Sequence, residues 1–256
     1  MSPQRQTQQA NRYSSVHDTA PTQPSSSGSG DRIVSDPQIA RYFRDDSRPL
    51  RDSLQLEMVA AQYHVRLQHV VSREGVPVGE AASAGVVAEL ERHGDPLSHA
   101  ILRALAHVGT GHTATRSAEA VGRLAERGIG LPLEFADVAE ARAIAAWRDT
   151  AGAIEGEYSL FLDFEHPLGR RHAIAIFVEP RNGGVVKHMG LITAISDFGP
   201  HDPVDASRLE TLDIAAAAAL LHDVLDRTFG TRLAGLDDFR VLIAATRARS
   251  LAGASG

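Results

Sequence analysis

The hydrophobic period of the chain changes near residue 157, and this change limits the possible folds more than any other feature of the sequence. In the segment EYSLFLDFE at 157–165, large apolar residues occupy alternate positions. Such a period of two is typical of a half-buried β-strand. Before this segment, apolar residues recur at helical spacing instead. We therefore expect an α+β protein in which helices and strands occupy separate parts of the sequence.

Two more strands are predicted after this one, at 172–179 and 185–194, where β-branched residues are frequent. The dipeptide Asn182-Gly183 lies between them. It favours a two-residue type I′ turn, because that turn needs positive φ at both central positions. The region 153–198 is therefore predicted to be a three-stranded antiparallel meander.

The hairpin turn also fixes an expected register. Counting back from it pairs Phe177 with His188 and Ala175 with Gly190. In this register, one face of the meander is expected to pack in the hydrophobic core. The other face carries small residues together with Asp163 and Glu165 from the first strand.

The region 36–152 is predicted to be helical. Asp95-Pro96 is a typical helix start, and Asp137 followed by Glu140 three residues later has the pattern of a capping box. We expect helices at 49–71, 79–92, 95–108, 115–127 and from 137 onward.

The remaining segments complete the predicted organisation. Residues 1–35 are rich in Gln, Ser, Thr, Pro and Gly, which is typical of a disordered tail. Helices at 203–229 and 237–250, within the region 199–256, are expected to pack on the sheet. Residues 36–252 could form one compact domain.

Composition excludes several classes of protein. There is no cysteine, so disulfides, thiolate metal sites and cysteine nucleophiles are excluded. The formal net charge of −6 makes nucleic acid an unlikely partner for the whole domain. No apolar run reaches membrane-spanning length and no secretory signal is recognised, so we expect a soluble, cytoplasmic protein without a membrane partner.

The segment AALLHDVLDRT at 218–228 resembles the His-Asp signature helix of the HD-domain metal-dependent phosphohydrolases. The resemblance implies that His222 and Asp223 bind a divalent cation, which would generate a hydroxide to attack phosphorus. His201 before Pro203 would be the upstream histidine, and Asp226 a further acid. In one continuous helix, however, His201 would lie about 30 Å from His222. A break near Thr211-Leu212-Asp213, with Asp213 capping a second helix, would bring the two histidines closer. The alternative interpretation is an amphipathic helix with these polar residues at its edge.

A second candidate site is the polar cluster predicted on the sheet, formed by Asp163, Glu165 and His188, with His166 and His172 nearby in sequence. Carboxylates and imidazoles on neighbouring strands can bind a ligand or do acid–base work. The spacing is not diagnostic of any metal.

The function predicted from these features is that of an interaction protein which binds a protein partner or itself and needs no cofactor. The alternative is the metal-dependent phosphohydrolase. A third class, nucleic-acid binding through the helix at 115–128, has Arg116, Arg123 and Arg127 in its favour.

Overall fold

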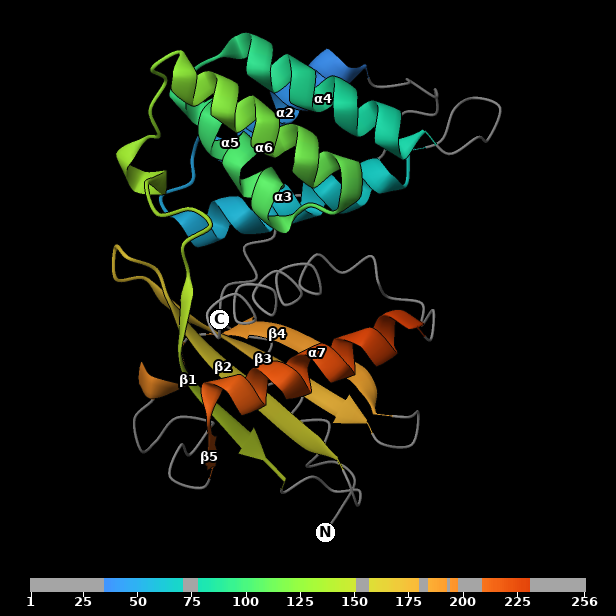
Figure 1. Ribbon diagram of the computed structural model, residues 1–256, viewed down its shortest axis with the longest axis vertical. Helices are drawn as coiled ribbons and strands as arrows, with labels where there is room; N and C mark the ends of the chain where they lie inside the picture. The colour runs from blue at the N-terminus through green and yellow to red at the C-terminus, as the bar shows by residue number, and fades with distance from the viewer. Residues whose placement is uncertain are drawn as a thin grey trace.

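A computed structural model of the chain describes residues 35–70, 78–150, 157–179, 184–192, 194–197 and 209–230. Helices α2 to α6 form one part of the molecule, and a sheet with helix α7 across it forms the other (Figure 1). The helices are α2 (Asp36–Ser47), α3 (Ser53–Gln68), α4 (Gly79–His93), α5 (Pro96–Val108), α6 (Gly111–Glu126) and α7 (Ile214–Gly230), with short 3-10 helices η1 (Leu133–Phe135) and η3 (Ile195–Asp197). The strands are β1 (Arg142–Asp149), β2 (Tyr158–Glu165), β3 (Arg171–Glu179), β4 (Val185–Ile192) and β5 (Glu210–Leu212).

Two helices of the N-terminal part, α3 and α5, begin at capping aspartates. The carboxylate of Asp52 accepts a hydrogen bond from the amide of Gln55 (2.9 Å), and that of Asp95 accepts one from the amide of Ser98 (2.8 Å). Each of these bonds satisfies an amide that has no partner within its helix. The helix predicted after Asp95 is confirmed, whereas α6 begins at Gly111, earlier than the predicted Thr115.

The sheet has five antiparallel strands in the order β4-β3-β2-β1-β5, so the prediction of three strands is wrong. The predicted pairs Phe177 with His188 and Ala175 with Gly190 are confirmed. A bulge follows, after which Val178 pairs with Val186. The turn at Asn182-Gly183 lies outside the described residues.

Strand β1 overturns the helix predicted from Asp137, and it lies inside the region 36–152 that was predicted to be helical. Alanine-rich sequence favours a helix, but propensity is a weak signal that tertiary contacts override. In the structure, Asp137 and Glu140, which were expected to cap this helix, form contacts with other parts of the chain instead. The carboxylate of Asp137 accepts hydrogen bonds from the hydroxyl of Ser53 and the amide of Leu168, and Glu140 forms an ion pair with Arg103.

Strand β5 overturns the continuous helix predicted at 203–229. The chain pairs with β1 at 210–212, and Asp213 then starts α7 by accepting hydrogen bonds from the amides of Ala215 (2.8 Å) and Ala216 (3.2 Å). The predicted tail and the predicted helix at 237–250 lie outside the described residues.

The core lies between the inner face of the sheet and the helices. Helix α7 crosses this face against β1, β2 and β4 and buries Leu221 and Val224 there (Figure 1). The same hydrophobic cluster continues through Phe135 and Val138 into the helical part. The outer face of the sheet has a smaller cluster of its own around Phe161.

A polar junction joins the two parts of the molecule. Glu57 of α3 is fully buried and accepts a hydrogen bond from the amide of Ala139 (2.9 Å). Asp52, at the start of the same helix, forms an ion pair with Arg170 in the β2–β3 turn (3.2 Å). Within the described ranges, no helix is long and apolar enough to cross a membrane.

Candidate functional site

Asp163, the most buried residue of the predicted sheet site, has a structural role. Its side chain is fully buried on β2. The carboxylate accepts hydrogen bonds from the amides of Ile195 (2.7 Å) and Ser196 (2.9 Å) and from the Ser196 hydroxyl (2.7 Å). These donors belong to the first residues of η3, so Asp163 anchors that 3-10 helix to the outer face of the sheet.

Glu165 and His188 do not converge on Asp163. The carboxylate of Glu165 forms an ion pair with Arg171 (2.9 Å). His188 is exposed on β4 and lies opposite Phe177, whereas Asp163 lies opposite Ala173. That offset of four positions along β3 corresponds to about 13 Å along the strand direction. The three side chains share a face of the sheet without forming one site.

The two other histidines of the predicted cluster are buried apart from Asp163. His172 lies opposite Phe164, on the inner face of the sheet, and its ring stacks on that phenylalanine at a centroid distance of 5.5 Å. The ring of His166 lies 5.5 Å from that of His172. Both histidines therefore belong to the packed interior.

The predicted metal site on α7 is only partly described. His222 is half-buried, Asp223 forms an ion pair with Arg227 (2.5 Å), and Asp226 is exposed. His201 lies outside the described residues. Across the ranges that the structure describes, no group of three or more His, Asp or Glu side chains is arranged to hold a metal ion.

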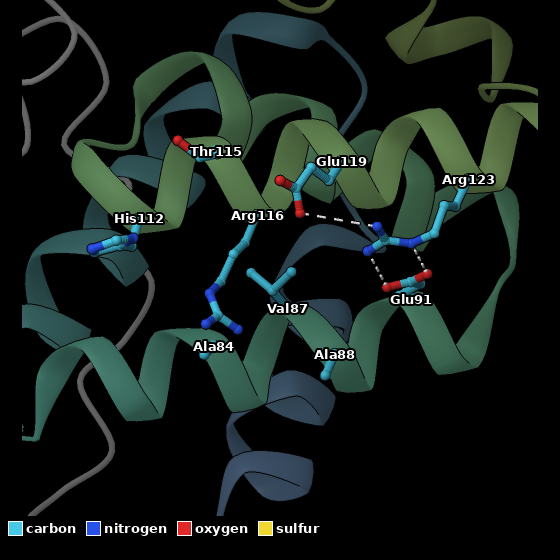
Figure 2. A pocket seen from close by; sticks show the side chains of 9 residues that line it. All are labelled: Ala84, Val87, Ala88, Glu91, His112, Thr115, Arg116, Glu119 and Arg123. Carbon is cyan, nitrogen blue, oxygen red and sulfur yellow. Dashed lines mark hydrogen bonds and ion pairs between the residues drawn. The ribbon is translucent and has the colours of Figure 1, made fainter.

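A groove between α4 and α6 is a candidate binding surface within the described residues. It has a volume of about 440 Å³. Figure 2 shows Val87 and the alanines on α4 and the longer polar side chains on α6. The lining residues are Ala84, Val87, Ala88, Glu91, His112, Thr115, Arg116, Glu119 and Arg123.

One end of the groove is closed by a charged clamp. Arg123 of α6 forms two hydrogen bonds with Glu91 of α4, from Nε to Oε1 (2.6 Å) and from Nη2 to Oε2 (2.9 Å). Glu119 lies 4.0 Å from the same guanidinium. The hydrogen bond from Arg123 lowers the pKa of Glu91 below its ordinary value, so this carboxylate stays charged near neutral pH. The clamp ties α6 to α4 in a fixed geometry.

The other end of the groove presents the guanidinium group of Arg116 and the imidazole of His112. Arg116 extends from α6 toward Ala84, and His112 lies one turn before it (Figure 2). Neither forms a hydrogen bond or an ion pair with the residues drawn there or with any other residue of the described ranges. The groove therefore combines a small apolar wall with one guanidinium group, that of Arg116, which has no ion-pair partner among the described residues.

A buried histidine positions the start of α6 beside this end. Nε2 of His64 accepts a hydrogen bond from the amide of Thr110 (3.3 Å) and lies 3.1 Å from the Thr110 hydroxyl oxygen. Burial lowers the pKa of His64, so its imidazole is neutral at physiological pH. Thr110 is the residue from which α6 begins.

Sequence reasoning identified only part of this groove. Arg116 and Arg123 were named, together with Arg127, as arginines of one predicted helix. The contribution of α4 was missed, because the pairing of Glu91 with Arg123 depends on how the two helices pack. No local spacing connects those two residues.

The sequence matches no known protein family, and neither a curated protein nor a solved structure is significantly similar to it.

Proposed function

We propose that this protein is an interaction protein that binds a segment of a protein partner in the groove between α4 and α6. The segment would place a carboxylate against Arg116 and small apolar side chains against Ala84 and Ala88. The observation that carries the proposal is that the guanidinium group of Arg116 lies beside an apolar wall and has no ion-pair partner in the described part of the chain. Aromatic and arginine anchors in such settings often dominate binding energy.

Charge complementarity indicates that the partner's segment is acidic. The clamp already neutralises Arg123, while Arg116 has no acidic partner among the described residues. An acidic segment would supply the missing counter-charge, and its association rate would fall as salt is added. A basic segment would be repelled at this end of the groove.

Affinity capture from cells that produce the protein tests this proposal through two variants that damage the groove by different means. Arg116→Glu reverses the free charge, and Ala88→Trp fills the space beside it. Arg142→Glu, at an exposed position on β1, is the matched control. We expect partners captured by the wild type to be lost with both groove variants and kept by the control.

Two other results of the affinity capture would be interpreted differently. The same partners captured by all four proteins would contradict the groove as the docking surface. If the partner captured is the protein itself, sedimentation velocity of purified wild type and Arg116→Glu will show a concentration-dependent dimer only for the wild type.

The alternative of a metal-dependent phosphohydrolase has one observation in its favour. The chain changes from strand to helix at Asp213, so a rigid helix does not hold residue 201 far from His222. This alternative predicts near-stoichiometric manganese or zinc after incubation and desalting, measured by elemental analysis. It also predicts that the metal is lost in His222→Ala. Protein without metal in both samples would contradict it.

A further inference from the structure

A second hollow, on the opposite side of α4, is surrounded by arginine side chains. It lies between α2 and α4 and has a volume of about 670 Å³. Its lining residues are Pro37, Arg41, Arg44, Asp45, Arg48, Glu89, Arg92 and His93. Four arginines line the hollow together with two carboxylates, and Asp95 pairs with one of these arginines, Arg44, so four positive and three negative side chains leave a formal local charge of +1 on a chain whose formal net charge is −6.

Two of these arginines are held in place by the protein. Arg92 forms hydrogen bonds from Nε (3.0 Å) and Nη2 (2.5 Å) to the two oxygens of Glu89. Arg44 forms an ion pair with Asp95, which caps α5, and its Nη1 lies 3.3 Å from Nδ1 of His93. Both guanidinium groups are therefore held in fixed positions at the wall of the hollow, each already paired with a carboxylate.

The other two arginines are held only loosely. Arg41 and Arg48 share the single carboxylate of Asp45, at 3.7 Å and 3.5 Å. Both distances exceed those of a charged hydrogen bond, so the guanidinium N–H groups have no hydrogen-bond acceptor among the described residues. Their side chains are 78% and 67% exposed, which leaves them free to reorient.

We propose that this hollow binds a phosphate-bearing small molecule. A guanidinium group matches the geometry of phosphate oxygens and donates to two of them at once. A phosphate placed between Arg41 and Arg48 would supply the acceptors that Asp45 does not, beside a wall in which Arg44 and Arg92 are already paired with carboxylates. The volume is larger than one phosphate needs and leaves space for an attached organic group.

Because of Asp45, the proposal predicts opposite effects on binding for different substitutions. Its carboxylate is the only acid between Arg41 and Arg48, so it competes with an incoming anion for both. Its removal should strengthen binding, whereas removal of the two arginines should weaken it. A purely structural role for these surface ion pairs would not produce opposite effects.

Isothermal titration calorimetry of the full chain with inorganic pyrophosphate tests this site at constant ionic strength. We expect saturable binding by the wild type with a Kd below about 1 mM. The double variant Arg41→Gln/Arg48→Gln should bind at least about tenfold more weakly, and Asp45→Asn should bind more tightly. Arg142→Gln, an exposed arginine on β1, is the matched control and should bind like the wild type.

Three results would overturn the proposal: no saturable heat with the wild type, equal affinity of Arg41→Gln/Arg48→Gln and the wild type, or an equal loss in Arg142→Gln. Full competition by chloride would indicate screening of exposed charge instead of a site. Thermal unfolding of each variant without ligand confirms that it is folded. Arg44 is left unchanged because its ion pair with Asp95 also supports the start of α5.

Discussion

Ala139 has the only positive φ found outside glycine in the described part of the chain, at 70°. This left-handed conformation costs an alanine about 1 kcal/mol, because its Cβ approaches the carbonyl oxygen. The residue persists in it because its amide donates to the buried carboxylate of Glu57 and the neighbouring Val138 packs in the core. Strain at one residue therefore helps to join the helical part of the molecule to the sheet.

Replacement of this alanine by glycine should stabilise the protein. Glycine adopts the left-handed region without steric cost, so we expect Ala139→Gly to raise the free energy of unfolding by about 0.5–1 kcal/mol. Ala118→Gly, at an exposed position in the middle of α6, should lower it by a similar amount. Urea denaturation measures both changes. Equal destabilisation by the two substitutions would show that Ala139 is not strained.

His64 should make stability depend on pH. Burial lowers its pKa in the folded protein from the ordinary 6.5. As pH falls through that value, the unfolded chain takes up a proton that the folded protein does not, so the free energy of unfolding decreases. The stabilisation is complete above about pH 6.5 and is lost below it.

Urea unfolding of the wild type and His64→Gln across this pH range measures the effect. Glutamine keeps an acceptor for the amide of Thr110 but does not titrate. We expect the stability difference between the two proteins to shift in favour of the variant as pH falls from about 8 to about 5.5. A difference that stays constant with pH would contradict the role given to His64.

At the scale of elements, Asp163 connects a strand to a 3-10 helix. Its replacement by alanine leaves three hydrogen-bond donors of η3 without their acceptor. We expect Asp163→Ala to lower the free energy of unfolding by about 2–4 kcal/mol, because unsatisfied buried donors are costly. Glu165→Ala, on the same face but in an exposed ion pair, should change it by less than about 1 kcal/mol. Similar losses in the two variants would contradict the anchoring role of Asp163.

The elements that could be predicted are those with strong local signals. The helix after Asp95 has both a capping side chain and a proline at its first position, and the β3–β4 register follows from alternation and turn chemistry. Strand β1 could not be predicted, because ARAIAAWR has helical propensity and becomes a strand only between β2 and β5. With only three residues, β5 is too short for a periodic signal.

The candidate sites, like the elements, could be predicted only where the signal is local in the sequence. Individual charged residues such as Arg116 were visible in the sequence. The groove and the hollow were not, because each arises where two helices pack side by side. Asp163 was predicted as a binding residue, whereas its carboxylate accepts hydrogen bonds from η3, a segment more distant in sequence than any local motif covers.

At the scale of the whole molecule, the continuous core predicts one cooperative unfolding unit. Trp147, the only tryptophan, lies on β1 and reports on the sheet, while the far-UV circular dichroism signal arises mainly from the helices. Urea midpoints from the two signals should coincide. They should fall together in Asp137→Ala, which removes an acceptor shared by Ser53 and Leu168. Separate midpoints would indicate that the helical part and the sheet unfold independently.

The order of elements along the chain has a consequence for synthesis on the ribosome. The first four strands are made before β5 and α7, so the meander can pair while Leu160, Ile174 and Ile176 on its inner face still lack the helix that covers them. Exposed apolar strands of this kind are prone to aggregation. A ribosome that pauses before residue 214 would prolong the time during which the inner face of the meander is exposed. Once α7 is complete, it covers this face.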